Sequence, residues 1–406
     1  MILTLLRKPK SPQIPVIIGT VFFVFCMVTF PAEVFDASRA GVNAWWNIVF
    51  PALLPFFISS ELLMGYGVVQ FMGVLLEPIM RPLFNLPGAG AFVMAVGYTS
   101  GFPISASLTA GLRKANICSR SEAERLLCFT NNASPLFMLV AVGVGMFSSP
   151  RLGIIIALSH YSANFLIGLL LRFYKKREAG VSPVIWRQGN ILGNAVSEMK
   201  KAYLANPRPF GKMLGDAITT SVTKLLLIGG FVIMFSIVIK ISCITGIMSC
   251  LTKIIGLCCM PLGFSDSIIS SIGWGFFEIT LGAKAAAGST APLAQKAVAA
   301  SIILGWSGVS VLAQVAAMIS GTDLRMGLFA LSRLFHSIIA GCTCYFLLRC
   351  RTVLAWLARP VSSPDPSSFP WLETLLWYSG IFLYTMGVLG LLALLVCLVR
   401  SVYSKY

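Results

Sequence analysis

Residues 97–114 read GYTSGFPISASLTAGLRK. They belong to an apolar segment, residues 88–112, which glycine, hydroxyl residues and proline interrupt at its middle and which Arg113 and Lys114 follow. Non-helical backbone at membrane depth is tolerated only where protein or a water-filled cavity surrounds it. The pattern therefore predicts a re-entrant helical hairpin with its tip in the GYTSGFP stretch.

A second apolar segment of the same kind lies at residues 266–288 and contains GWGFFEITLGAK. A shift of 174 residues aligns Gly101 and Phe102 with Gly275 and Phe276. Identity between the two halves is low, so the match lies in the order of elements and in their breakpoints. The sequence therefore predicts two structural repeats.

Each half also contains a helix with a polar interruption, NNASP at residues 131–135 and GWSG at residues 305–308. With a cytoplasmic N-terminus, four crossings return the basic segment at residues 175–224 to the cytoplasm, where excess Lys and Arg belong. The second hairpin then enters from the side opposite to the first. Inverted repeats of this kind are typical of secondary transporters, whose sites lie near the bilayer midplane where helices are broken.

Composition supports a membrane protein throughout the chain. Of 406 residues, 57% are hydrophobic and 11% charged, and the mean hydropathy is +0.86. The net charge of +17 could suggest nucleic acid, but the cations collect at helix ends, where anionic headgroups and the positive-inside bias account for them. The eleven cysteines show no CxxC spacing, so we interpret them as small helix-packing residues.

We expect an all-α polytopic membrane protein with inverted structural repeats, each with a re-entrant helical hairpin and a broken transmembrane helix. The expected divisions are an N-terminal transmembrane helix at 1–44, a first transport repeat at 45–174 with its hairpin at 88–112, a cytoplasmic basic loop at 175–224, a second repeat at 225–349 with its hairpin at 266–288, and a linker with a C-terminal transmembrane helix at 350–406.

The candidate substrate-binding residues lie at these four breaks. They combine hydroxyl, amide and carboxyl groups with exposed backbone, and such groups inside a membrane are costly unless they have a partner or a function. They are Ser100, Gly101, Phe102, Pro103, Asn131, Asn132, Ser134, Glu278, Thr280, Ser307 and Ser310.

Each candidate also has a structural interpretation. The first tip could be a kink at a packing interface, and the asparagines could join helices. Glu278 could pair with Lys284, and Glu61, in a comparable apolar run, has no motif around it. His160 and Asn164, four residues apart, more plausibly brace two helices than carry protons.

Three stretches carry a resemblance to a known family. They are residues 97–114, the run SRSEAERLLCFTNNASPLFMLVAVGVGMF at 119–147, and SHYSANFLIG at 159–168; FFEITLGAK at 276–284 fits as well. Over roughly Trp45 to Leu348 the chain resembles the YlbJ family of sporulation integral membrane proteins. That family belongs with the nucleoside-recognition or gate domain proteins and is similar in architecture to concentrative nucleoside transporters.

The resemblance implies transport of dipicolinic acid (pyridine-2,6-dicarboxylate) from the mother cell across the outer forespore membrane during sporulation. The partners implied are dipicolinate and the lipid bilayer. No nucleic acid, cofactor or metal is expected, and a coupling proton or cation is left open. The alternatives are transport of nucleosides or another small metabolite, and a non-transporting scaffold of the spore envelope. An enzyme is not expected, because His160 and His336 have no spacing that would assemble a nucleophile, base and orienting group.

Overall fold

The protein is all-helical in the part of the chain that its structure describes. The structure is a computed structural model that describes residues 13–68, 83–114, 116–175, 191–205 and 207–350, isolated positions between 70 and 80, and residue 353. The predicted C-terminal transmembrane helix therefore lies outside the described residues, as does most of the predicted linker at 350–406.

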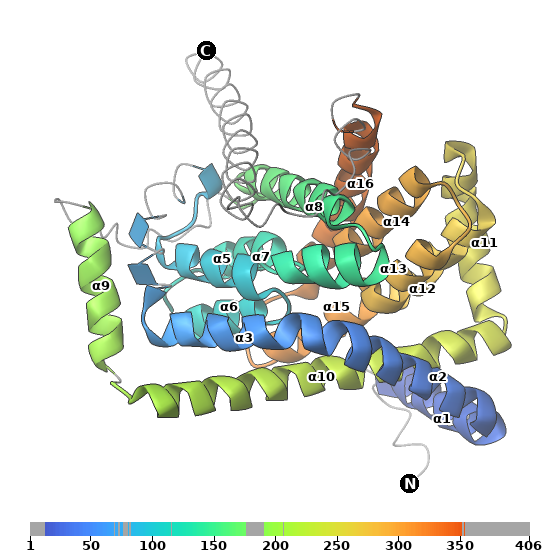
Figure 1. Ribbon diagram of the computed structural model, residues 1–406, viewed down its shortest axis with the longest axis horizontal. Coiled ribbons are helices and arrows are strands. Elements are labelled where there is room, and N and C mark those ends of the chain that lie inside the picture. Colours follow the sequence, from blue (N-terminus) through green and yellow to red (C-terminus); the bar gives the residue numbers. More distant parts are fainter. Residues whose placement is uncertain are drawn as a thin grey trace, which may run out of the picture.

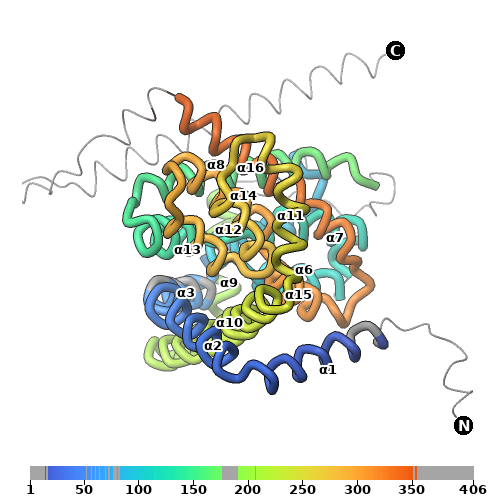
Figure 2. Tube along the Cα trace, turned by 90° about the vertical axis from the view of Figure 1, so that its right-hand side faces the viewer, coloured from blue at the N-terminus to red at the C-terminus, as the bar shows by residue number. Residues whose placement is uncertain are grey.

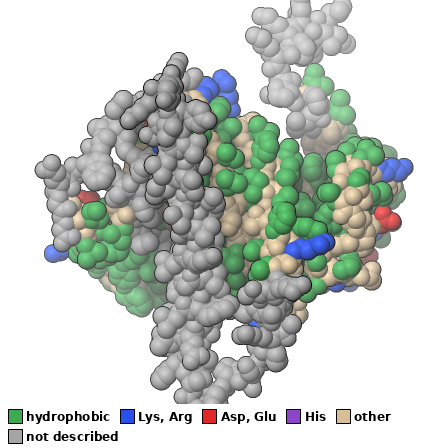
Figure 3. All heavy atoms as spheres, turned by 90° about the horizontal axis from the view of Figure 1, so that it is seen from above, with side chains coloured by type: hydrophobic (Ala, Val, Ile, Leu, Met, Phe, Trp, Pro, Cys, Tyr) green, Lys and Arg blue, Asp and Glu red, His purple; other side chains and the backbone are tan. Residues whose placement is uncertain are grey.

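Four described helices are long and apolar enough to cross a membrane, with mean hydropathies of 1.4 to 2.4 in their most apolar windows. Hydrophobic side chains also cover much of the described surface in Figure 3. The prediction of an all-α polytopic membrane protein is confirmed. The four are α8 (Pro150–Leu171), α10 (Phe210–Ile244), the broken pair α14 (Leu293–Trp306) and α15 (Gly308–Ile319), and α16 (Met326–Arg349).

The N-terminal region differs from the predicted single helix at residues 1–44. Helix α1 (Gln13–Thr29) ends at a bend of 102°, and α2 (Pro31–Ala44) begins a new direction along the outside of the bundle (Figure 2). The bend follows from Pro31, which lacks the N–H needed to continue a helix but suits the first position of the next one. Helix α2 then continues through a π-helical stretch (Trp45–Val49) into α3 (Phe50–Gly65), without a boundary at Trp45.

Helix α10 lies alongside α2 and α3 over most of its length (Figure 1). A Cβ atom on Gly41 would lie 2.9 Å from the Ile233 Cα atom, and one on Gly229 would lie 2.6 Å from the Trp45 ring. The Trp45 Nε1 atom donates to the Leu225 carbonyl at 2.9 Å. Small residues thus allow these long helices to approach closely, as is common between membrane helices.

The described part of the segment at 175–224 is mostly helical, whereas its polarity predicts a loop. It contains α9 (Ile191–Ala205) and the first turns of α10, which begins at Phe210 after Pro209. Polar residues at a helix end project into water or headgroups without breaking backbone hydrogen bonds, so charge alone does not distinguish a loop from a helix that extends beyond the membrane.

Each half contains a pair of short helices joined at a tight break. The pairs are α5 (Ala89–Ser100) with α6 (Ile104–Lys114), and α12 (Asp266–Phe277) with α13 (Ile279–Gly288). They occupy the ranges predicted for the two hairpins and lie toward opposite ends of the bundle in Figure 1. Their orientation across a membrane, and hence the inverted repeat, stays a prediction.

A broken helix follows each pair. Helix α7 (Arg120–Thr130) ends at Asn131, and after extended residues the chain enters a π-helical segment (Phe137–Met146) before α8. In the second half, α14 and α15 are separated by Ser307, whose φ of 76° is left-handed. Between the halves, α10 is followed by the short α11 (Ile247–Cys259) and a turn of 3-10 helix (Met260–Leu262).

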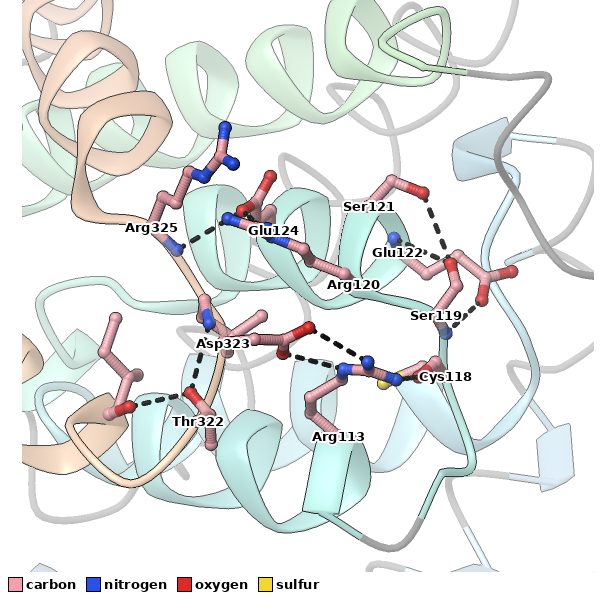
Figure 4. Close-up of polar contacts among 12 residues, drawn as sticks. Arg113, Cys118, Ser119, Arg120, Ser121, Glu122, Glu124, Thr322, Asp323 and Arg325 are labelled. Carbon is pink, nitrogen blue, oxygen red and sulfur yellow. Dashed lines mark hydrogen bonds and ion pairs between the residues drawn. The ribbon is translucent and has the colours of Figure 1, made fainter.

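An ion pair and a hydrogen bond join the two halves on one face (Figure 4). Arg113, at the end of α6, donates through Nε and Nη2 to both carboxylate oxygens of Asp323 at 2.9 and 3.0 Å. This hydrogen bonding holds the pKa of Asp323 below its usual range. Glu124 accepts from the Arg120 Nε atom at 2.9 Å and from the backbone N–H of Arg325 at 3.3 Å. The base of the first hairpin is thereby tied to the α15–α16 connection.

Gly282→Ala tests the close contact inside the second hairpin. The added Cβ atom would lie 2.3 Å from the Gly275 Cα atom, so the two helices must separate. We expect a loss of stability of about 1 to 3 kcal/mol, measured by thermal unfolding in detergent. Gly288→Ala, which meets no heavy atom within 4 Å, is the control and should unfold with the parent. Equal stability of both variants would contradict this packing.

Reporter cysteines test the predicted topology. In a cysteine-free variant, Lys200→Cys in α9 should react with a membrane-impermeant reagent from the cytoplasm. Leu262→Cys, at a side chain that is 75% exposed, should react from the opposite side. Labelling of both positions from one side would end the inverted-repeat interpretation.

Candidate functional site

The breaks of both halves meet around one cavity between the hairpins, the broken helices and the α3–α10 pair. The cavity has a volume of about 60 Å³. Its polar groups come mainly from the breaks, and α3, α10 and the π-helical stretch before α3 supply an apolar wall made of Val49, Leu53, Phe57, Ile228 and Val232.

The structure brings most of the sequence-predicted residues to this cavity. Those that line it are Ser100, Gly101, Phe102, Ser134, Glu278, Thr280 and Ser310. Pro103, Asn131, Asn132 and Ser307 do not line it, although all four are buried next to residues that do.

Four half-helices begin at the cavity wall. Phe102, Ser134, Thr280 and Ser310 lie at or near the N-terminal ends of α6, the 137–146 segment, α13 and α15. The first N–H groups of a helix have no intrahelical partner and carry a partial positive charge. These N-terminal ends therefore favour a negatively charged group, whereas the C-terminal end of α5, at Ser100 and Gly101, lies on the same wall and does not.

Among the described residues that line the cavity, only Glu278 has an ionisable side chain, and it is 3% exposed. Its backbone is extended, with φ −145° and ψ 125°, which ends α12 and starts α13. One carboxyl oxygen accepts from the Leu281 N–H at 2.7 Å, and Thr280 also hydrogen-bonds the carboxyl group. Glu278 is thus the N-cap of α13, and it is not paired with Lys284, whose side chain is exposed.

Helix α15 lacks such a cap. Its N-cap residue, Ser307, makes no side-chain capping hydrogen bond, and its left-handed backbone turns the chain sharply into Gly308. Ser310 and Val311 from the first turn of α15 line the cavity. An anionic ligand in the cavity could therefore take at α15 the place that Glu278 takes at α13.

The asparagine pair, Asn131 and Asn132, holds the α7 break in place through hydrogen bonds and does not line the cavity. Asn131 accepts from the Ser105 hydroxyl at 2.9 Å, which ties α7 to α6, and Asn132 Nδ2 donates to the Phe129 carbonyl at 2.9 Å. Both side chains are fully buried. The geometry gives them a role in holding the break, and it places their neighbours Ala133 and Ser134 at the cavity.

Arg333 has a role that its sequence position did not reveal. Arg333 is 0% exposed and lies within the bundle. Its guanidinium donates to the carbonyls of Cys128 and of Asn131, the latter at 3.2 Å. These carbonyls end α7, where the helix dipole is negative, so Arg333 caps the C-terminal end of the half-helix.

Asn164 of α8 braces several helices. Its Nδ2 atom donates to the Tyr98 hydroxyl of α5 and to the Phe129 carbonyl of α7. His160 packs against His336 of α16, with ring centroids 4.3 Å apart, and the His160 carbonyl contacts the His336 Nε2 atom at 2.9 Å. Neither histidine lines the cavity, and their contacts are those of helix packing.

Two further observations limit the chemistry that the residues around the cavity can carry out. Glu61 is ion-paired with Lys224, away from the cavity wall. Among the described residues, no group of three or more His, Cys, Asp or Glu side chains could hold a metal ion, so no metal site is assigned. The arrangement suits reversible binding of a small ligand that has a negative charge and an apolar body.

Sequence reasoning missed the cavity's apolar wall and Gln314. Gln314 is 5% exposed and lies 3.5 Å from the Ser310 hydroxyl. It is one helical turn after Ser310, so helical spacing from a predicted site residue could have found it. The residues of α3 and α10 have no polar signal, and nothing local distinguishes them from lipid-facing positions.

Comparisons with known proteins agree with this membrane fold. Residues 47–160 match the family described as Gate: Nucleoside recognition. The sporulation integral membrane protein YlbJ of Bacillus subtilis strain 168 is 45% identical over 330 residues, 79% of each chain. An uncharacterized protein of Alkalihalophilus pseudofirmus is 29% identical over 131 residues, which cover 30% of this chain and 27% of that protein.

Two solved structures of CNTnw are similar to this chain. One is in an intermediate state and the other in an inward-facing, substrate-bound state. Both are 13% identical and cover 82% of this chain and 88% of their own, with TM-scores of 0.40 and 0.39.

Substitutions of Glu278 separate its capping role from its charge. Glu278→Gln keeps an oxygen that can accept from the Leu281 N–H but has no exchangeable charge. We expect this variant to bind and exchange substrate without concentrating it. Glu278→Ala loses the cap as well, at a cost of about 1 kcal/mol, and should fail in both. Exchange and net accumulation of a labelled substrate in proteoliposomes measure the two activities.

If both variants accumulate the labelled substrate as the parent does, Glu278 is structural and the assignment of the second hairpin to the site is wrong.

Proposed function

Because the chain belongs to the YlbJ family of sporulation integral membrane proteins, we propose that it transports dipicolinic acid from the mother cell across the outer forespore membrane. The protein is a transporter-like integral membrane protein involved in sporulation. The identity of the substrate, the membrane that it crosses and the direction of transport are the parts that we propose.

The observation that carries this proposal is the convergence of four half-helix N-termini on a cavity with aromatic walls. Dipicolinate is a planar ring with two carboxylates. Each helix N-terminus presents about half an elementary positive charge to an anion. The uncapped N-terminus of α15 is the position we assign to one carboxylate.

The aromatic ring finds suitable partners in the cavity. Phe57, Phe102 and Phe137 line it from α3, the first hairpin and the segment after the α7 break. Offset-stacked or edge-to-face contacts with such rings contribute about 0.5 to 1.5 kcal/mol each beyond burial. A small aromatic anion would thus use both the walls and the breaks.

Glu278 limits how the ligand can lie. Two like unit charges about 4 Å apart repel by about 4 kcal/mol at an effective dielectric constant of 20. An ionised Glu278 therefore opposes a second carboxylate at α13, and we place the ligand carboxylates toward the α6 and α15 ends. A coupling proton or cation that neutralises Glu278 would ease this repulsion, which is one way that transport could be coupled.

Nucleosides are the second candidate substrate, because residues 47–160 match a family described as Nucleoside recognition. A nucleoside is neutral and would gain little from converging helix N-termini, but it could use the Ser, Thr and Gln groups for its ribose. A scaffold without transport needs only small residues at the breaks, and it would use the buried Glu278 only as the N-cap of α13.

Spores and vesicles together test the proposal. A strain that lacks this protein should make dipicolinate in the mother cell but form spores nearly devoid of it. Proteoliposomes that contain only this protein should take up labelled dipicolinate, and unlabelled dipicolinate should compete better than nucleosides. Normal dipicolinate in mutant spores would remove the substrate assignment, and preferential uptake of a nucleoside would replace it with the second candidate.

A further inference from the structure

A second cavity lies between α3 and α10, along the line where these two helices pack, which we call the seam. It has a volume of about 300 Å³ and is lined by Glu61 and Gly65 of α3, by residues of α10, and by Ala202 and Arg208. The stacked rings of Tyr66 and Tyr203, 5.9 Å apart, hold α9 beside the end of α3. We call it the outer cavity and the cavity at the helix breaks the inner cavity.

The two cavities share one stripe of α3. Leu53, Phe57, Glu61 and Gly65 follow one another at intervals of four residues, which places them on one helix face. The first two line the inner cavity and the last two line the outer cavity. The inner cavity thus ends one helical turn before Glu61.

The residues of α10 also divide between the two cavities, but in the opposite order along the chain. Ile228 and Val232 line the inner cavity, whereas Asp216 and Thr220 line the outer cavity. Lys224 lies between the two sets, one turn from Thr220 and one turn from Ile228. The helices are therefore antiparallel along a common seam.

An ion pair occupies the boundary between the cavities. The Lys224 Nζ atom contacts a Glu61 carboxylate oxygen, and the side chains are 26% and 18% exposed. A second pair in the outer cavity joins the Arg208 Nη1 atom to Asp216 at 2.7 Å. Both cations of this region thus have a carboxylate partner from the protein itself.

We propose that the outer cavity is a second binding site for small carboxylates and that the Glu61–Lys224 ion pair is the gate between it and the inner cavity. An incoming carboxylate takes the place of Glu61 as the partner of Lys224, and the released Glu61 side chain opens the seam. The ligand class rests on the proposed function, whereas the gate does not.

The exchange is energetically reasonable because it replaces one ion pair with another. Partly exposed ion pairs contribute little to stability, so neither partner is held strongly. Arg208 provides a second cation for a ligand with two carboxylates, since Asp216 can be displaced in the same way. Beyond Lys224 the seam is apolar up to the helix breaks, where the half-helix N-termini favour the anion again.

The gate is tested with a thiol reporter in the inner cavity. Val232→Cys, at a side chain that is 1% exposed, is made in a cysteine-free variant and labelled with an uncharged methanethiosulfonate from the side of α9, so that the rate reports on opening and not on the attraction of an anion. Glu61→Gln or Lys224→Gln should raise the labelling rate about fivefold, the population ratio that corresponds to about 1 kcal/mol of ion-pair free energy. The charge reversal Glu61→Lys with Lys224→Glu should return it to the parent rate.

Asp36→Asn is the matched control, because it removes an ion pair with Arg39 on α2 away from the seam, and it should leave the rate unchanged. Parent-like labelling in both single variants, or a fast rate in the charge reversal, would overturn the gate.

The binding site is tested with Thr220→Cys in the outer cavity. Dipicolinate should protect this cysteine in the parent and in Glu61→Gln, and less well in Lys224→Gln, because only the last variant lacks Lys224 and keeps Arg208 as its one remaining cation. Equal protection in all three would overturn the role of Lys224. Vesicle uptake reports on the proposed function separately. A labelling response without dipicolinate uptake counts against the substrate and leaves the gate in place.

Discussion

The backbone of a helix that breaks inside a membrane must find partners for the N–H and carbonyl groups that the break releases. In this protein the carbonyl ends are satisfied by side chains from other helices. Arg333 and Asn164 donate to the end of α7, and the Trp306 indole donates to the Phe276 carbonyl near the end of α12 at 3.0 Å. The packing of α8, α14 and α16 around the breaks depends on these bonds.

The same arrangement separates the partially negative ends of the half-helices from the partially positive ends. With the carbonyl ends of α7 and α12 capped within the bundle, the N-terminal ends of α6, α13 and α15 remain beside the cavity. Glu278 has two roles, since it caps α13 and also lines the cavity. A site with an anion-favouring backbone and one carboxyl group follows from the fold, before any ligand is considered.

The long helices α3 and α10 supply the other side of the site. Close approach at Gly41 and Gly229 holds α10 against α2 and against Trp45 just before α3, and the shared face of α3 and α10 changes from apolar beside the breaks to charged near α9. This change matches the passage from the membrane interior to its surface, where water and headgroups make charged side chains inexpensive. The seam between them connects the two environments.

The sequence by itself determined the membrane class and the places where the apolar runs are interrupted, Asn131 and Ser307 among them, because interrupted apolar runs are a local property of the chain. It also singled out Glu278. It could not distinguish a polar loop from the extended helices α9 and α10, since both carry the same charges. Only the tertiary structure decided that Arg333 caps α7 and that apolar residues of α3 and α10 close the cavity. Burial and partner choice depend on residues far apart in the chain, and no local pattern records them.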